Sequence, residues 1–400
     1  MSAPAAAPGR RGLAVLFSVV IVDLVGFGIV MPALPFWARE FGADATTLGL
    51  LMSAYAVAQF LCAPLWGRLS DRVGRRPVLL GTIAGTAVAL LAVGLAPSLA
   101  WLFAARLAAG AFAANVSVAS AYISDVTAPA ERTRWMGMLG ASFGVGFVLG
   151  PAIGGLLQPF GHAVPMLVAA GLSAVNWGFA FVRLGEPARH AAAAAAPGGR
   201  LGVLRDPVVR RITLANLVFS LAVTQLETLF AYFMMDRFAW DMRRVGFLLA
   251  AMAVVMGGIQ GGGMKALSAR LPERSLVVGG VLLLAVGFGG VPLPGSVALL
   301  MLPLLFAAVG RAIAQPALLS LASQAAQPEQ RGLVMGAFQS SASLARIVGP
   351  ALGGLLYDVS RPAPFFLASG LLLLVAVGAR ALPRGAAAAE SASAAPVTLP

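Results

Sequence analysis

Two acidic residues stand inside long apolar stretches of the sequence. Asp23 lies within residues 13–36, and Glu227 lies within residues 208–234. A charge in hydrocarbon is costly and is tolerated chiefly where it serves a function. Because burial favours the neutral acid, either carboxyl group could take up a proton on one side of a membrane and release it on the other. A structural hydrogen bond between helices is the alternative for each residue.

Arginines also interrupt the apolar stretches. Arg106 could help a neighbouring acid release its proton, or it could simply hold two helices together. Arg311 and Arg346 could neutralise Glu227 or attract an anionic substrate, and the sequence leaves both options open. We therefore expect Asp23, Glu227 and Arg106 to be the residues that couple protons.

A dense polar segment, residues 67–77, separates two apolar stretches and reads Gly-Arg-Leu-Ser-Asp-Arg-Val-Gly-Arg-Arg-Pro. Its two glycines predict a tight hairpin, and its acid can pair with an arginine or lie at a helix amino terminus. Such a charged contact can break and re-form, although a turn that only sets topology is the alternative. The predicted cytoplasmic gate comprises Gly67, Asp71, Arg72, Gly74, Arg75 and Arg76, together with Asp125, which we expect to pair with Arg132.

The composition indicates that membrane-spanning helices position these residues. Charged residues make up 11% of the 400 residues, against about 25% in an ordinary soluble domain, and the mean hydropathy is +0.89. Apolar runs long enough to cross a bilayer indicate helices, because a barrel would show alternation instead. Twelve spans are predicted, at 13–36, 47–66, 77–96, 99–122, 135–157, 163–182, 208–234, 243–264, 275–293, 296–322, 332–356 and 363–382.

The basic residues that give the chain its formal charge of +13 lie mainly in the predicted loops. Most of the 28 basic residues fall in every second loop counted from the amino terminus, which places both termini in the cytoplasm. This distribution is typical of membrane topology and of contact with lipid headgroups, and it argues against nucleic acid as a partner.

The two halves of the chain are related. Residues 129–157 match residues 328–356, and Gly-Pro-Ala-x-Gly-Gly-Leu-Leu occurs in both segments. Six spans per half is an even number, so the two repeats should enter the membrane in the same direction. We expect a cytoplasmic tail (1–12), a six-helix bundle (13–183), a cytoplasmic linker (184–207), a second six-helix bundle (208–382) and a disordered cytoplasmic tail (383–400).

Glycines recur at intervals of about four residues in the fifth span. This spacing predicts a groove along one helix face where a neighbouring backbone can approach closely. The proline in the same segment removes a backbone hydrogen bond and should bend the helix. Simple close packing is the alternative to a functional role. The residues are Gly140, Gly144, Gly146, Gly150, Pro151, Gly154 and Gly155.

Together these motifs resemble the major facilitator superfamily, and within it the twelve-span drug/proton antiporters, most of all the tetracycline/proton antiporters. The segments that carry the resemblance are Asp23 to Pro35, the 67–80 loop, Arg106 with Gly110, Gly137 to Gly155, and Asp236 to Trp240. The resemblance implies the major facilitator fold and an antibiotic-resistance type of antiporter, functioning as a monomer in the bacterial inner membrane. It also implies that the 67–77 loop locks the outward-open state.

The resemblance further implies a substrate class, namely small amphipathic organic compounds exported by alternating access in exchange for protons. The chain has Ala89 and Met256 where tetracycline antiporters carry an acid and a histidine, and residues 275–291 contain no acid. We therefore expect a substrate other than metal-chelated tetracycline. Candidate pocket residues are Phe27, Gln59, Asn115, Phe143, Phe147, Gln225, Phe230 and Gln339.

Two other function classes compete with export. A proton-coupled uptake symporter for a metabolite or sugar would use the same fold and the same acids. An enzyme or an ATP-driven permease is disfavoured, because Lys265 is the sole lysine and lies in no phosphate-binding Gly-x-x-x-x-Gly-Lys sequence. His162 and His190 are too isolated for a metal site, so no cofactor is expected and the proton gradient is the energy source.

Overall fold

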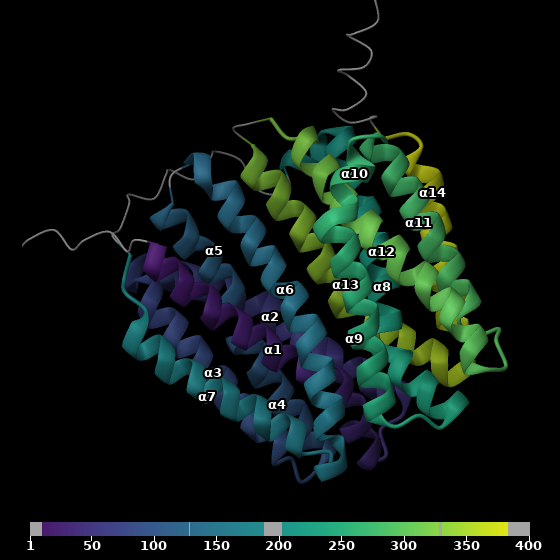
Figure 1. The fold of residues 1–400 in the computed structure, drawn as a ribbon, viewed down its shortest axis with the longest axis horizontal. Helices are drawn as coiled ribbons and strands as arrows, with labels where there is room; N and C mark the ends of the chain where they lie inside the picture. Colours follow the sequence, from purple (N-terminus) through teal and green to yellow (C-terminus); the bar gives the residue numbers. More distant parts are fainter. Residues whose placement is uncertain (1–9, 128, 188–201, 328–329, 383–400) are drawn as a thin grey trace, which may run out of the picture. The chain divides into compact units, whose positions relative to one another are not determined.

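The computed structural model describes residues 10–127, 129–187, 202–327 and 330–382, and within these ranges the regular elements are all helices. The predicted tails 1–12 and 383–400 and the middle of the linker lie largely outside the described residues. In chain order the helices are α1 (Arg10–Glu40), α2 (Ala45–Val73), α3 (Arg75–Gly94), α4 (Leu99–Phe112), α5 (Asn115–Val126), α6 (Pro129–Leu157), η1 (Gln158–Phe160), α7 (Val164–Arg183), η2 (Gly202–Arg205), α8 (Pro207–Phe238), α9 (Met242–Gly258), η3 (Ile259–Gly263), α10 (Met264–Ser268), α11 (Glu273–Gly290), α12 (Val297–Ala325), α13 (Arg331–Val359) and α14 (Ala363–Ala379) (Figure 1).

These helices confirm the predicted all-α membrane fold. Ten spans of the described chain are long and apolar enough to cross a bilayer, and α13 and α14 fill the positions of the last two predicted spans. Two spans depart from the single α-helix that the sequence had suggested. The fourth is interrupted between α4 and α5, and the eighth passes through the π-helical turn η3 before α10.

The described residues form two compact units. Unit 1 comprises those within 1–194 and 231–251, and unit 2 comprises those within 195–230 and 252–400. Unit 1 therefore includes the carboxyl-terminal end of α8 and the first part of α9. The boundaries of the bundles and linker inferred from the sequence stay a prediction.

Side chains define where several helices begin. Asp44 accepts a hydrogen bond from the Thr47 backbone N–H at 2.7 Å, and Ser98 accepts one from the Trp101 N–H at 3.3 Å. Each bond satisfies an amide that has no partner inside its helix. The bond to Thr47 also lowers the pKa of the Asp44 carboxyl group, which keeps this cap ionised.

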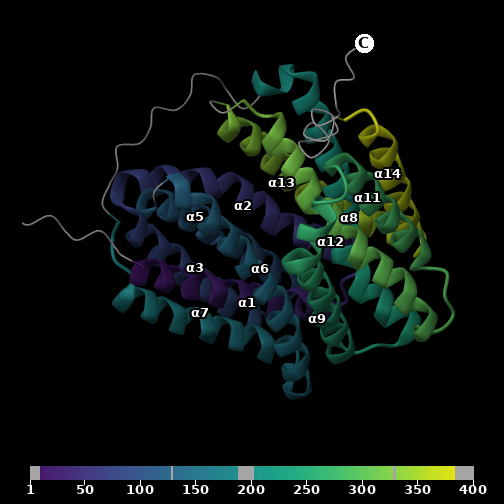
Figure 2. The same ribbon diagram turned by 45° about the horizontal axis from the view of Figure 1, so that its top comes forward.

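In unit 1, α1 packs along α6 and α7, and α7 also lies beside α3 (Figures 1 and 2). The contact between α1 and α6 depends on glycine. A Cβ atom on Gly146 would lie 2.7 Å from the Cβ of Leu24, and one on Gly150 would lie 2.8 Å from the Ile29 nitrogen. The backbones therefore touch where a side chain would separate them.

The predicted glycine groove is only partly correct. A Cβ on Gly140 or Gly144 would meet no described atom within 4 Å, so these two residues are not part of the contact. The groove continues toward the carboxyl-terminal end of α6 instead. A Cβ on Gly155 would lie 3.0 Å from the Arg243 carbonyl oxygen at the start of α9. Gly154 lies between the two contacts, facing Ile29 of α1 and Met242 of α9.

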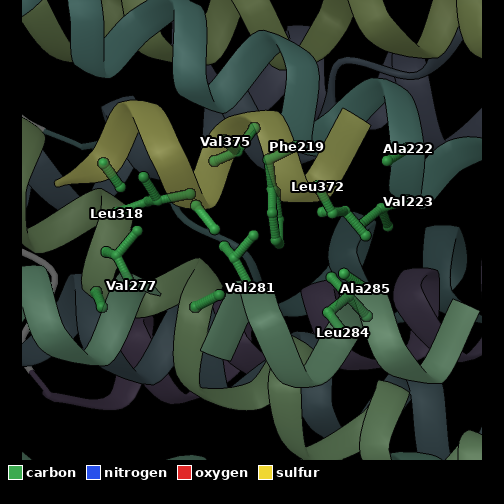
Figure 3. Close-up of a cluster of buried hydrophobic side chains, with 14 of the residues drawn as sticks. Phe219, Ala222, Val223, Val277, Val281, Leu284, Ala285, Leu318, Leu372 and Val375 are labelled. Carbon is green, nitrogen blue, oxygen red and sulfur yellow. The ribbon is translucent and has the colours of Figure 1, made fainter. Parts of the chain in front are cut away.

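Unit 2 is built around an apolar cluster supplied by several of its helices. Phe219 and Val223 of α8 meet Val281 and Leu284 of α11 (Figure 3). Residues of α12, α13 and α14 complete the cluster, including Leu318, Phe338 and Leu372. Here too glycine allows close approach, since a Cβ on Gly280 would lie 2.8 Å from the Ala314 nitrogen.

The glycine contacts predict different outcomes for two glycine-to-alanine substitutions on α6. Gly150→Ala should force α1 and α6 apart and destabilise the protein by about 1–3 kcal/mol, the usual cost of overpacking. Gly144→Ala is the matched control and should be neutral or slightly stabilising, because alanine favours helix. Thermal unfolding of both purified variants measures the difference, and equal midpoints would contradict the packing described here.

Candidate functional site

The fourth span is broken in the middle of unit 1. Ala113 and Ala114 separate α4 from α5 and leave carbonyl groups without helical partners. Two side chains of α2 satisfy them: Trp66 Nε1 donates to the Ala111 oxygen at 2.6 Å, and Gln59 Nε2 donates to the Ala113 oxygen at 3.0 Å. A broken helix within a membrane needs such partners, and breaks of this kind are typical of ion and substrate sites. Gln59 is a pocket candidate from the sequence, whereas in the structure its side-chain amide is bonded to the Ala113 carbonyl oxygen at the break.

Asp23 lies at this break. Asn115, the first residue of α5, donates from Nδ2 to Asp23 Oδ1 at 2.8 Å. The amino terminus of α5 carries the positive end of the helix dipole, which also favours an anion. Asn115 is 5% exposed, and its Oδ1 atom has no hydrogen-bond partner among the described residues. The structure thus brings together two residues that the sequence had assigned to different groups, the proton-coupling acid and the pocket amide.

Arg106 of α4 is also buried, at 5% exposure. Its guanidinium carbon lies 4.3 Å from the centre of the Tyr55 ring, and Nη2 lies 3.8 Å from the sulfur of Met52. Within the described chain Arg106 forms no ion pair, and its Nε atom has no partner. Stacking on an aromatic ring offsets part of the cost of the buried charge.

Aromatic side chains of three helices gather near these polar groups. Phe27 of α1 lies 6.3 Å from Phe147 of α6 in a T-shaped arrangement, and 6.2 Å from Tyr55 of α2. The two phenylalanines are among the pocket candidates predicted from the sequence, and Tyr55 is not. Its polar hydroxyl in an otherwise apolar span is the feature that could have indicated it. Phe143 instead packs beside the apolar core of unit 1.

The polar segment after the second span is more helical than predicted. α2 runs to Val73 and α3 begins at Arg75, so the turn consists of Gly74 alone, with φ at 116°. Only glycine adopts this backbone conformation readily. Gly67 lies inside α2 and takes no part in the turn, which corrects the predicted role of that residue.

Arg75 is the centre of a polar cluster. Its Nη1 donates to Asp71 Oδ1 at 2.6 Å and to Ser70 Oγ at 2.7 Å, and its Nε donates to Asp125 Oδ2 at 2.7 Å. The expected pair between Asp125 and Arg132 is therefore wrong, because Arg132 donates to the Ser124 carbonyl oxygen instead. We call Ser70, Asp71, Arg75 and Asp125 the Arg75 cluster.

Glu186, which the sequence did not single out, binds the same region. Its two carboxylate oxygens accept the backbone N–H groups of Arg75 and Arg76 at 2.7 and 2.9 Å. A carboxylate is favoured there because it satisfies free amides at the positive end of α3. Arg76 also donates to the Phe181 carbonyl oxygen at 2.6 Å, whereas Arg72 is exposed.

Unit 2 holds a charged pair inside the predicted membrane region. Arg311 Nη2 of α12 lies 2.5 Å from Glu227 Oε1 of α8, and the side chains of Glu227 and Arg311 are 26% and 27% exposed. The structure thus decides between the two arginines, since Arg311 neutralises Glu227 while Arg346 is exposed. Gln225 and Phe230 are buried at 1% and 4% exposure, so these two pocket candidates lie in the interior of the fold. Gln339 is exposed on α13.

Comparison with known proteins gives the family. The profile of the Major Facilitator Superfamily matches residues 16–264 and 264–398. The chain belongs to this superfamily. As a major facilitator protein it is a multi-pass membrane transporter, which confirms the fold and the family inferred from its motifs.

Two curated relatives and one solved structure refine the similarity. The class D tetracycline resistance protein of Salmonella ordonez is 33% identical over 348 residues, covering 85% of this chain and 88% of that protein. The class C protein of Escherichia coli is 31% identical over 360 residues, covering 88% and 91%. The crystal structure of the human organic anion transporter MFSD10 matches with a TM-score of 0.71 and 28% identity, covering 93% of this chain and 99% of that one.

Glu186 provides a test of how α3 is held. Glu186→Ala should expose the Arg75 and Arg76 amides and speed their hydrogen exchange, because both lose their acceptor. Glu131→Ala removes an exposed acid from the first turn of α6 and is the control, with no expected change at α3. Hydrogen–deuterium exchange of the peptide containing residues 70–80 measures the effect, and unaltered exchange in Glu186→Ala would refute the cap.

The charged pair in unit 2 predicts a compensation between substitutions. Glu227→Gln or Arg311→Gln alone leaves one partly buried charge without its partner and should cost about 1–3 kcal/mol of stability. The double variant removes both charges and should be more stable than either single variant. Thermal unfolding of the four proteins measures this coupling, and additive losses would show that the pair contributes nothing.

Proposed function

We propose that the protein exports small amphipathic organic compounds in exchange for protons, as a monomer that alternates its access in the bacterial inner membrane. Both termini would lie in the cytoplasm. The observation that carries the proposal is Asp23, an acid in the middle of a membrane-spanning helix, bonded to the first residue of a half-helix. Tetracycline resistance proteins among the relatives support drug export as the activity.

Asp23 has the environment that a proton carrier requires. Its one hydrogen bond to a described residue comes from a neutral amide, so no fixed cation holds the carboxylate in its ionised form. The group can therefore exchange a proton when its exposure changes. One proton crossing about 150 mV releases roughly 3.5 kcal/mol, enough for a substrate ratio of roughly 300 at one-to-one exchange.

The aromatic residues near Asp23 support an amphipathic substrate. Phe27, Tyr55 and Phe147 offer ring faces and edges to an apolar body, while Asp23 offers one polar anchor. Ala89 and Met256 lack the polar groups that a metal-chelated drug requires. We accordingly propose a compound other than tetracycline as the principal substrate.

The Arg75 cluster is the proposed cytoplasmic gate. Its ion pairs join the ends of α2 and α5 to the start of α3. They can break and re-form as the transporter changes state, because partly exposed pairs of this kind have modest net stability.

One observation favours a second candidate, the uptake symporter. Protonation of Glu227 would release Arg311, whose guanidinium could then hold an organic anion. Proton and anion would bind together, which is the requirement of symport. The organic anion transporter among the structural relatives is consistent with this alternative. The direction of transport under an imposed pH gradient separates the two candidates.

The proposal predicts the effect of Asp23→Asn. Inverted vesicles from a pump-deficient bacterium expressing the protein should accumulate probe dyes such as ethidium when their lumen is made acidic. Asp23→Asn should abolish this accumulation while leaving the protein in the membrane, because the amide carries no exchangeable acid proton. Asn176→Leu is the control, since it removes a hydrogen bond from Asn176 to the α1 backbone and leaves the Asp23 side chain and its bond to Asn115 in place.

A susceptibility screen of the same strain against a panel of amphipathic drugs, tetracycline included, identifies the substrate. Resistance that is retained in full by Asp23→Asn, together with an unaltered pH response of dye transport, would remove Asp23 from the mechanism.

A further inference from the structure

The half-helix α5 has a polar contact at each of its ends. Asn115, its first residue, is bonded to Asp23, and Asp125, near its last, is bonded to Arg75. At 1.5 Å per residue these two positions are about 15 Å apart along the helix axis. A single rigid element thus spans the distance between the buried acid and the Arg75 cluster, and all of these residues belong to unit 1.

The contact at Asn115 depends on the charge of Asp23. While Asp23 is ionised, the Asn115 amide donates a charge-assisted hydrogen bond to it, and such bonds are stronger than neutral ones. When Asp23 is protonated, the carboxyl group is a weaker acceptor and a new donor. The buried Oδ1 atom of Asn115, which has no partner among the described residues, is the acceptor that an amide rotation would present to it. Asn115 therefore donates to Asp23 in one state and accepts from it in the other, and the second bond is the weaker because neither group is charged.

The break before α5 separates this helix from the hydrogen-bond ladder of α4, although α5 stays packed in the apolar core of unit 1. The carbonyl groups of Ala111 and Ala113 are bonded to Trp66 and Gln59 of α2 and not to α5. A tilt of α5 therefore does not require the hydrogen bonds inside α4 to break. By contrast, α1 is fixed by its glycine contact with α6 and by Asn176 of α7, which donates to the Val19 carbonyl oxygen at 2.9 Å.

The other end of α5 has two bonds to the neighbouring region. Asp125 accepts from Arg75, and the Tyr122 hydroxyl donates to the Gly185 carbonyl oxygen at 2.9 Å. Gly185 precedes Glu186, whose carboxylate caps α3. Movement of α5 would therefore act on both the ion pairs of Arg75 and the cap of its helix.

We propose that α5 transmits the protonation state of Asp23 to the Arg75 cluster, with Asn115 and Asp125 as the positioning residues at its two ends. The inference rests on the proposed role of Asp23 as the proton carrier, and it adds how that proton is communicated to the gate. Protonation loosens the bond at Asn115, α5 tilts, and the ion pairs of Arg75 weaken.

Other ionisable groups near α1 must be separated from Asp23. Among the described residues, Asn115 alone forms a hydrogen bond with the Asp23 carboxyl group, and none forms an ion pair with it. A comparison of variants at one fixed pH isolates Asp23 from every other group. The ionisable residues with described side chains on α1 and on the helices packed against it are Arg39, Glu40, Tyr122, Asp125, Glu131, Arg132, Arg134 and Arg183, and those stacked next to the break are Tyr55 and Arg106.

The test uses Asp23→Asn as a mimic of the neutral acid. Hydrogen–deuterium exchange of residues 67–80 is measured in lipid nanodiscs at one pH for the wild type and for Asp23→Asn. The same pair is then measured in an Asn115→Leu background and in an Asn176→Leu background. Asn176 is a matched control: it is a buried asparagine bonded to α1 whose Oδ1 also lacks a partner among the described residues, but it lies on α7.

We expect Asp23→Asn to speed exchange of residues 67–80 by about tenfold, the factor that corresponds to loss of one charge-assisted bond. Asn115→Leu alone should give similarly fast exchange, and Asp23→Asn should add nothing to it. In the Asn176→Leu background the full effect of Asp23→Asn should remain. If Asn115→Leu is unfolded by its melting profile, Asn115→Ala takes its place.

Two results would overturn the inference. One is an equal effect of Asp23→Asn with and without the Asn115 substitution. The other is unaltered exchange in Asp23→Asn while pH-driven transport is lost, in which case Asp23 still carries the proton but α5 does not transmit its state. Loss of the proposed function itself would be seen differently, as retained pH-driven transport in Asp23→Asn.

Discussion

Hydrocarbon gives a polar group no partner, and this constraint explains the arrangement around Asp23. Interrupting a membrane helix at Ala113 and Ala114 exposes carbonyl groups that must be bonded within the protein. Trp66 and Gln59 supply those bonds from α2. The interruption in turn places Asn115 and the positive end of α5 beside the carboxyl group. The acid, the break and the two donors on α2 thus depend on one another.

Glycine determines which parts of unit 1 are fixed. At Gly146 and Gly150 the backbones of α1 and α6 are in direct contact, which holds α1 in place. α5 makes no such glycine contact with α1 among the described residues, and apolar packing together with the side-chain hydrogen bond to Asp23 connects the two helices. The same helix reaches the Arg75 cluster through Asp125. A fixed helix that carries the acid, beside a half-helix that is not continuous with α4, is suited to turning a change of charge into a movement.

Hydropathy and charge were enough to predict the features that the cost of burial dictates, but not those that depend on partners far apart in the chain. The membrane spans and the two acids inside apolar stretches belong to the first kind, whereas the sequence did not distinguish Arg75 from Arg72 and Arg76. The break at Ala113 was missed, because alanine is the best helix former and gives no signal. Asp125 was paired with nearby Arg132, although its partner Arg75 lies 50 residues away. Glycine spacing alone could not separate Gly150, which is in contact, from Gly144, which is not.

The central proposal is that Asp23 carries the proton that is exchanged for cargo, from which it follows that cargo binding should displace a proton from Asp23. It is tested most directly by adding the substrate found in the susceptibility screen to purified protein in weakly buffered detergent containing a pH indicator. Binding to the wild type is predicted to acidify the medium, and binding to Asp23→Asn is predicted not to do so. Substrate binding without proton release by the wild type, or equal release by both proteins, would contradict the claim.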